Sequence, residues 1–304
     1  MRIVYMGTPE FAVSPLKRLY SDGYQIVGVF TQPDKPRNRG MKISYSPVKE
    51  VALSYGTQIF QPTSLTDTSV VEIISKLNCD VIVVVAYGKL LPKTLLDLPP
   101  MGCINVHASL LPKYRGAAPI NWAIINGETE TGVTSIFMSE ELDTGDILLS
   151  GKTSIGDDET AGQLHDRLSI AGADLISETI ASLSTGDIVP KPQNKDEATY
   201  APQLTRAMST INWNEKAIEI KRKVRGLDPW PTATTPINGT VFKLFAVDIV
   251  EKSHDHIPGE IVSVDKTAIN IACNNGFIAI KELQAPGGKR MSTSEYMKGH
   301  TFTL

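Results

Sequence analysis

The chain has 304 residues, of which 41% are hydrophobic and 21% charged, with a formal net charge of −3. This composition excludes collagen-like and disordered classes, and the length allows two domains. The near-neutral charge shows no whole-chain signature of nucleic-acid binding, so any such site must be a local patch. The amino-terminal segment turns polar within ten residues, which predicts neither a signal peptide nor a transmembrane helix. We therefore expect a cytoplasmic protein with no membrane partner.

The first half of the chain alternates short aliphatic runs with helical patterns. The runs are rich in β-branched residues and apolar on both faces, as central parallel strands are. They cover residues 3–6, 26–30, 81–86, 104–106 and 133–138, and the expected helices cover 9–20, 47–55, 69–77, 120–126 and 161–182. Thr8 before Pro9, and Ser46 before Pro47, are typical helix starts. This alternation predicts an α/β fold with a doubly wound, Rossmann-like parallel sheet.

The pattern changes near residue 189, where prolines and polar residues without periodicity predict an extended linker. One helix, 215–225, follows, and then come strand-like runs at 241–250, 260–264, 268–271 and 277–283. Asn238-Gly239 between β-type runs predicts a hairpin turn. Short strands at this spacing predict a small OB-like β-barrel. We expect a catalytic domain over residues 1–188, a linker over 189–206 and a barrel domain over 207–304.

Several familiar chemistries are disfavoured by the motifs that the chain lacks. The first strand–helix turn, "MGTPEFA", has no G-x-G-x-x-G, which argues against a dinucleotide cofactor. Cys79, Cys103 and Cys273 are widely spaced and are expected to be buried, inert thiols. His254 and His256 have no nearby third ligand, so we expect no metal site.

Polar side chains stand at the ends of two predicted strands. Asn105 and His107, two residues apart, share one face of a strand, and Asp143 and Asp146 follow the strand at 133–138. In open α/β sheets the ligand lies beyond the carboxyl ends of the strands. An Asn amide can donate to an oxyanion, a His can transfer a proton, and an Asp can fix its tautomer and stabilise its charged form. A hydrogen-bonded His beside unrelated surface carboxylates remains the alternative on spacing alone.

Basic residues cluster in three places. The loop at 31–47 carries Lys35, Arg37, Arg39 and Lys42, and its length without predicted structure favours a functional role. The predicted helix at 215–225 holds four more cations, and a Lys-Arg pair follows Gly287-Gly288. Each cluster is either a solvated basic face or a phosphate-binding surface, and spacing does not decide between them.

Two longer stretches resemble a known signature. "INVHASLLPKYRGAAPINWAI" and "TGVTSIFMSEELDTGDIL" are similar to the signature of the folate-dependent formyltransferases, and "MGTPEFA", "TQPD", "SPVK", "AYGKLLP", "DPWPTA" and "GGKRM" extend the resemblance over the whole chain. The resemblance implies formyl transfer from 10-formyltetrahydrofolate, without a metal, to the α-amino group of initiator methionyl-tRNA. It also implies catalytic roles for Asn105, His107 and Asp143.

The resemblance and the basic clusters together predict two binding surfaces. The expected folate-binding residues are Val85, Ala86, Tyr87, Gly88, Leu90, Leu91, Ser109, Leu110, Leu111 and Pro112. The expected tRNA-binding residues are Arg37, Arg39, Lys42, Lys221, Arg222, Lys223, Arg225, Lys289 and Arg290. We expect a monomer.

Two rival functions stay open at this point. The signature does not specify the acceptor, so the same site could transfer the formyl group to a sugar nucleotide or to water. A non-catalytic RNA-binding module on a retired enzyme fold is the third hypothesis, against which the intact Asn105, His107 and Asp143 argue.

Overall fold

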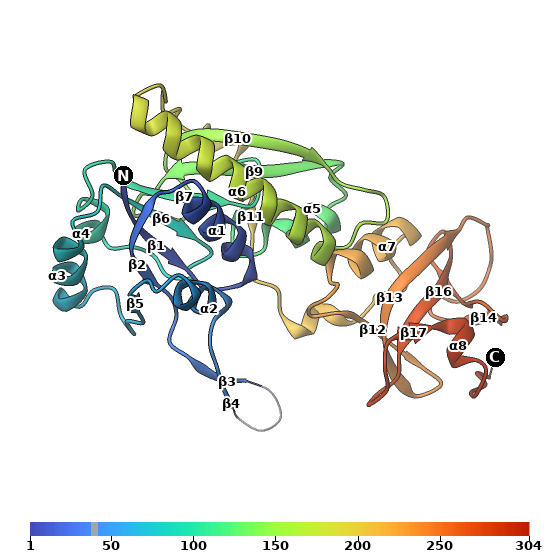
Figure 1. Ribbon diagram of the computed structural model, residues 1–304. Helices are drawn as coiled ribbons and strands as arrows, with labels where there is room; N and C mark the ends of the chain where they lie inside the picture. The colour runs from blue at the N-terminus through green and yellow to red at the C-terminus, as the bar shows by residue number, and fades with distance from the viewer. Residues whose placement is uncertain (38–41, 304) are drawn as a thin grey trace. The chain divides into compact units, whose positions relative to one another are not determined.

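The computed structural model describes residues 1–37 and 42–303. The chain divides into two compact units, which are described separately (Figure 1). Unit 1 comprises Met1–Pro119, Glu130–Ser154 and His165–Ala201, and unit 2 comprises Ile120–Thr129, Ile155–Leu164 and Pro202–Leu304. Across the described residues, no helix has both the length and the apolar character that a membrane crossing requires.

A seven-stranded sheet forms the centre of unit 1, in the order β10-β9-β7-β6-β1-β2-β5. Its strands are β1 (Arg2–Gly7), β2 (Gln25–Phe30), β5 (Ile59–Phe60), β6 (Val81–Val85), β7 (Cys103–His107), β9 (Glu130–Phe137) and β10 (Ile147–Ser154). The strands from β7 to β5 are parallel, as predicted. The prediction of a parallel strand at 133–138 was wrong, because β9 runs antiparallel to β7 and forms a hairpin with β10.

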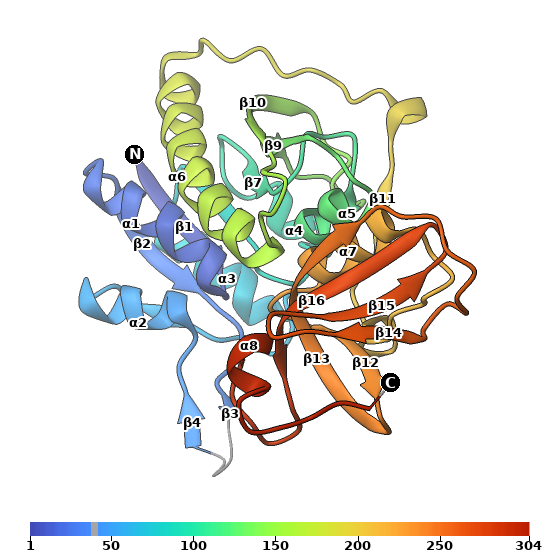
Figure 2. The same cartoon turned by 90° about the vertical axis from the view of Figure 1, so that its right-hand side faces the viewer.

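Helices cover both faces of this sheet, which confirms the doubly wound α/β class. On one face, α1 (Val13–Ser21) lies beside α6 (Ala161–Thr185), as Figures 1 and 2 both show, and Ser169 of α6 donates to the Phe11 carbonyl at 3.0 Å. On the other face, Ile74 of α3 (Thr68–Leu77) and Leu95 of α4 (Lys93–Leu96) belong to the buried core.

One of the two predicted helix starts is confirmed and the other is wrong. Helix α2 (Pro47–Ser54) begins after Ser46, whose hydroxyl accepts a hydrogen bond from the Lys49 N–H at 3.1 Å. The earlier helix instead begins as a 3₁₀ turn, η1 (Glu10–Ala12), with Pro9 at the N-cap position. Thr8 does not cap it, because its hydroxyl accepts a bond from the Gln32 N–H at 3.3 Å.

The segment between α6 and unit 2 is tied to unit 1 by backbone hydrogen bonds. Lys191 and Ile147 exchange both of their N–H···O bonds, at 2.8 and 2.9 Å. A short turn, η2 (Lys195–Glu197), follows, and β11 (Tyr200–Ala201) pairs in parallel with β8 (Arg115–Gly116). Residues 189–201, which we call the strap, are therefore an ordered part of unit 1.

The basic loop at 31–47 contains a hairpin that the sequence did not indicate. Strand β3 (Lys35–Arg37) pairs antiparallel with β4 (Lys42–Ser44), and the backbone register pairs Arg37 with Lys42. The prediction for Arg39 falls outside the described residues. Next to the hairpin, the Lys49 ammonium binds both Asp34 and Gln61.

Unit 2 contains an antiparallel sheet in the order β12-β13-β16-β15-β14, with β17 paired to β16. Figure 2 shows its marked curl. The strands are β12 (Ala233–Ile237), β13 (Thr240–Val250), β14 (Ile261–Val264), β15 (Ile269–Cys273), β16 (Gly276–Gln284) and β17 (Met291–Ser292), and the helical segments are α5 (Pro119–Ile125), η3 (Arg206–Ser209), α7 (Ala217–Gly226) and α8 (Thr293–Tyr296). The small-barrel prediction is confirmed. So is the hairpin turn, because Asn238 and Gly239 have φ angles of 45° and 78° between the paired Ile237 and Thr240.

Candidate active site

The candidate site lies in unit 1, at the edge where β6 and β7 end. Val84 of β6 pairs with Asn105 of β7 in parallel, so the carboxyl ends of both strands meet there. Asn105 is half-buried, and His107 is only 6% exposed. The side chains of both residues leave the same face of β7, as their spacing predicts.

The hydrogen bond between His107 and the Tyr114 carbonyl determines the tautomer of the imidazole. Its Nε2 lies 2.8 Å from the carbonyl oxygen of Tyr114, and a carbonyl oxygen can only accept. The neutral ring therefore carries its proton on Nε2. Its Nδ1, which then has the lone pair, lies 3.6 Å from Oδ2 of Asp143. The nitrogen that can take up a proton thus faces a carboxylate.

Asp143 reaches this cluster from the connection between β9 and β10. Its Oδ1 accepts a hydrogen bond from Asn105 Nδ2 at 3.3 Å, and its Oδ2 accepts one from the Gly116 N–H at 2.9 Å. The side chain is only 8% exposed, which argues against an unrelated surface carboxylate. Asp146, the other candidate, lies where the hairpin closes, with its carbonyl bound by the Phe137 N–H at 2.9 Å.

The route by which Asp143 arrives differs from the predicted one. We expected the carboxyl ends of adjacent parallel strands to bring the residues together. Because β9 is antiparallel to β7, its end at Phe137 lies beside Ile104, at the start of β7. The β9–β10 connection therefore has to fold back toward Asn105. It does so through a left-handed residue, Asp143, whose φ is 54°.

Residues near the cluster that the sequence did not single out complete its hydrogen-bond network. The Gln193 amide donates to the carbonyls of Asp143 and Gly145, at 2.8 and 2.7 Å. Its oxygen accepts from the Arg115 guanidinium, which is 4% exposed. No sequence pattern identifies Gln193, because it stands 50 residues from Asp143 in an aperiodic segment.

The loop at 109–112, which follows β7, is held by hydrogen bonds. Ser109 donates to the Lys113 carbonyl and its own carbonyl accepts from Thr134, both at 2.6 Å. The Leu111 N–H also donates to the Thr134 hydroxyl, at 3.2 Å. Ser109 and Leu111 are buried, whereas Leu110 and Pro112 remain half-buried. Of the side chains predicted for this wall, those of Leu110 and Pro112 are therefore the ones that keep some exposure to solvent.

In the other predicted wall, residues 85–91, the side chains differ in exposure. Tyr87 and Leu91 are each 2% exposed and belong to the core, while Leu90 is 57% exposed. Burial raises the pKa of Tyr87 to about 12, so its hydroxyl stays neutral. Ala86 is exposed and, like Gly88, has a positive φ, which turns the chain immediately after β6.

The cations of α7 are engaged within unit 2. Lys221 pairs with Asp158 at 2.5 Å, and the hydrogen bond from Lys221 lowers the pKa of that carboxyl. Lys223 donates to the Thr210 carbonyl at 3.0 Å. Arg225 donates to the carbonyls of Gly156 and Glu159, both at 2.9 Å. The predicted phosphate-binding helix thus uses three of its cations to hold neighbouring segments.

The pair Lys289-Arg290 of unit 2 also includes a cation that is engaged within that unit. Arg290 binds Asp228 at 3.3 Å and Glu282 at 2.7 Å, and its guanidinium lies 4.2 Å from the centre of the Phe245 ring. Lys289 is exposed. Of this pair, Arg290 is therefore engaged with carboxylates of unit 2.

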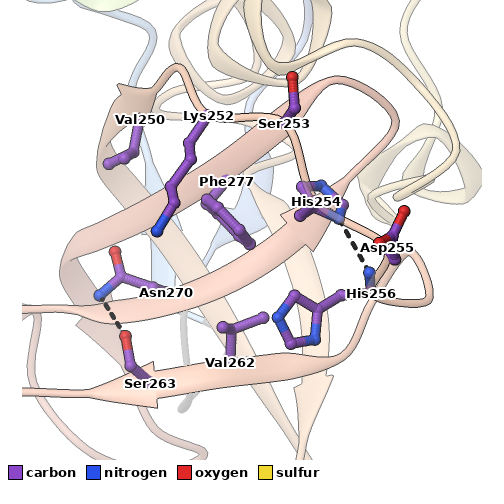
Figure 3. Close-up of a pocket in the computed structure, with 10 residues that line it drawn as sticks. All are labelled: Val250, Lys252, Ser253, His254, Asp255, His256, Val262, Ser263, Asn270 and Phe277. Atoms are coloured by element: carbon purple, nitrogen blue, oxygen red, sulfur yellow. Dashed lines mark hydrogen bonds between the residues drawn. The ribbon is translucent and has the colours of Figure 1, made fainter.

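A cavity of about 710 Å³ lies on unit 2, beside the connection between β13 and β14 (Figure 3). His254 lines it, with Nε2 at 2.9 Å from two carbonyls, those of Cys273 and Gly276, and with Nδ1 accepting from the His256 N–H. Both nitrogens of His254 are therefore occupied by the backbone. Within the part of the chain that the structure describes, no group of three or more His, Cys, Asp or Glu could hold a metal ion.

Family models match both units of the chain. The model described as formyl transferase matches residues 1–180, and the model described as formyl transferase, C-terminal domain, matches residues 203–301. The chain belongs to the formyl transferase family. The methionyl-tRNA formyltransferase of Alkaliphilus oremlandii is 51% identical to it over 99% of this chain and 97% of its own length. That of Caldanaerobacter subterraneus is 49% identical, with the same two coverages.

Solved structures of proteins with lower sequence identity share the fold. The N-formyltransferase from Helicobacter canadensis in complex with folinic acid and dTDP-3-aminofucose superposes with a TM-score of 0.69 at 18% identity, over 95% of this chain and 99% of that one. HypX from Aquifex aeolicus in complex with tetrahydrofolic acid gives a TM-score of 0.63 at 19% identity, over 98% of this chain and 47% of that one. At such identities the likeness concerns the fold alone.

Proposed function

We propose that this chain transfers the formyl group of 10-formyltetrahydrofolate to the α-amino group of initiator methionyl-tRNA. The observation that carries the proposal is the buried cluster of Asn105, His107 and Asp143, which combines an amide donor, a base and a carboxylate. Membership of the formyl transferase family supports the reaction. The relatives named methionyl-tRNA formyltransferase, at 51% and 49% identity, support the acceptor.

The first chemical step is attack of the neutral amine on the formyl carbon. A peptide α-amine has a pKa of about 8, so part of it is neutral near pH 7. As the carbon–nitrogen bond forms, negative charge develops on the formyl oxygen. The Asn105 amide carries two N–H groups, one of which is directed at Asp143. The other can stabilise the oxyanion, an effect worth about 2.7–4 kcal/mol for one such donor.

The second step moves a proton from the attacking nitrogen to the departing one. His107 Nδ1 holds the lone pair that can accept this proton. Asp143 then lies beside the imidazolium and stabilises its charge. The bond from the formyl carbon to N10 of the folate breaks, and the proton leaves with tetrahydrofolate. The products are therefore the formylated amine and tetrahydrofolate.

The formyl donor would bind along the edge where β6 and β7 end. The backbone of residues 85–88, together with Ala86 and Leu90, would form one wall. Leu110 and Pro112 would form the other. Both walls follow strands that end at the same edge as His107, so the donor's formyl group would lie beside the cluster.

We also keep the predicted tRNA surface as a proposal, with a division of roles. The hairpin with Arg37 and Lys42, and the exposed Lys289, would contact phosphates directly. The paired cations of α7 and Arg290 would contribute positive potential. A charged tRNA as acceptor favours a cytoplasmic location. A monomer would suffice, because the three catalytic residues come from one chain.

The acceptor is tested by offering several amines to the purified protein with 10-formyltetrahydrofolate. We expect formylmethionine to appear on methionyl initiator tRNA, and no product with free methionine or with an amino-sugar nucleotide. Release of formate alone, or formylation of the sugar nucleotide, would keep the chemistry and overturn the acceptor. Background rates with every acceptor would indicate a non-catalytic RNA-binding protein instead.

A further inference from the structure

The side-chain amide of Gln193 links three parts of unit 1 at the candidate active site. Its Nε2 donates to the carbonyl oxygens of Asp143 and Gly145, and its Oε1 accepts from Nε and Nη2 of Arg115, at 3.1 and 2.6 Å. The two carbonyl oxygens can only accept, so they must face the amide nitrogen of Gln193. The guanidinium can only donate, so it must face the amide oxygen. The orientation of the amide is therefore fixed by its partners.

The two carbonyls that Gln193 binds flank a turn with a demanding backbone. Asp143 has a φ of 54°, a left-handed conformation that residues other than Gly, Asn and Asp seldom adopt. At Gly145 a Cβ atom would lie 1.7 Å from the Phe137 carbonyl oxygen, so the chain passes too close for any side chain. The Gln193 amide bridges both residues of this turn. It thereby favours the one backbone path that brings the Asp143 carboxylate to His107.

The opposite side of Gln193 is equally constrained. Arg115 is 4% exposed and lies in β8, next to Gly116, whose N–H donates to Asp143 Oδ2. Strand β8 is itself paired with β11 in the strap. Gln193 therefore binds the backbone of Asp143, and Gly116 binds its carboxylate. The two are connected through Arg115, which binds Gln193 and precedes Gly116 in β8.

We infer that Gln193 is a positioning residue for formyl transfer, which acts by fixing Asp143 against His107. This inference rests on the proposed function, because it assumes that Asp143 supports the proton transfer. The strap that carries Gln193 thus completes the active site as well as leading the chain into unit 2. Gln193 touches no reacting atom, so its loss affects the chemical step more than substrate binding.

The direct test compares Gln193→Ala, Gln193→Glu and the neighbouring control Asn194→Ala. Asn194 has the same amide chemistry, but its side chain binds within its own turn, to Asp196 and Glu197. Gln193→Glu keeps an oxygen for Arg115 and loses both donors to the turn. We expect both Gln193 variants to lower kcat by about 10- to 100-fold, as misplacement of about 1 Å does, with KM for folate and tRNA changed less than about twofold. An unchanged kcat in Gln193→Glu, or an equal loss in Asn194→Ala, would overturn the inference.

A double-mutant cycle separates positioning from a general loss of folded protein. If Gln193 acts through Asp143, then Gln193→Ala should reduce kcat by less than about twofold in an Asp143→Asn background. A smaller fraction of folded enzyme would instead lower kcat by the same factor in both backgrounds, and that result would contradict the inference.

Failure of the inference is distinguishable from failure of the proposed function. Full activity of Asn105→Ala would count against the proposed chemistry itself. Loss of activity in Asn105→Ala, together with full activity in Gln193→Ala, would reject the positioning role alone.

Discussion

At the scale of single residues, the tautomer of His107 decides what the site can do. The Tyr114 carbonyl holds the proton on Nε2 and leaves Nδ1 as the basic atom, facing Asp143. We expect His107→Asn to lower kcat by about 10²- to 10⁴-fold, the usual range for loss of a general acid–base group, with tRNA affinity retained. Initial rates at saturating substrates measure this. His165→Asn, on α6, is the matched control, and an equal loss there would contradict the assignment.

The cysteines allow a second prediction at this scale. Cys79, Cys103 and Cys273 are free and buried, as the sequence indicated, and burial raises the pKa of Cys103 to about 12. Because the thiolate is the reactive form, none of the three should react with Ellman's reagent at pH 8 while the protein is folded. All three should react in guanidinium chloride. Rapid labelling of any of the three thiols in the native protein would contradict this prediction, because it would show that the buried cysteine is accessible to the reagent.

Individual residues also show how far the sequence could predict the site. Asn105 and His107 were predictable because alternation along a strand places residues i and i+2 on one face. Asp143 was predicted from its motif, but the antiparallel β9 that determines its route was not, since strand direction is set by distant pairing. The contacts of Gln193 span 50 and 48 residues, and no local pattern encodes such contacts.

At the scale of elements, the structure supports a different interpretation of α7 from the one that the sequence suggested. Four cations in one helix suggested a phosphate-binding face, but composition does not show which carbonyls and carboxylates lie nearby. In the structure Lys221, Lys223 and Arg225 bind groups of unit 2. The long apolar strands and helices were predictable from periodicity. The short elements β3, β4, β8 and β11 were not, since two or three residues have no period to detect.

A stability measurement tests this interpretation of α7. Arg225→Ala leaves two carbonyls without their donor, so we expect the free energy of unfolding to fall by about 1–3 kcal/mol. Lys289→Ala, at an exposed position, should change it by less than about 0.5 kcal/mol. Urea denaturation of the full chain measures both. An unchanged stability of Arg225→Ala with a large loss of tRNA affinity would favour direct phosphate contact instead.

At the scale of the whole molecule, the net charge of the chain is −3, whereas its proposed acceptor, tRNA, is a polyanion. Binding therefore depends on local basic surfaces, and it should weaken steeply with salt. Even two phosphate contacts would reduce the affinity by about tenfold between 50 and 200 mM salt. Filter binding of charged tRNA over this range measures the slope. An affinity that does not respond to salt would exclude phosphate recognition as the main source of binding.

The central claim is that Asn105, His107 and Asp143 carry out formyl transfer to methionyl initiator tRNA. Its most direct test is the single-turnover rate of formylmethionine formation by Asn105→Ala, measured with both substrates saturating and with tRNA affinity determined in parallel. The oxyanion role predicts a rate about 10²- to 10³-fold below that of the unmodified chain, with tRNA affinity within about twofold. An unchanged rate, or a rate that falls only as far as tRNA affinity does, would contradict it.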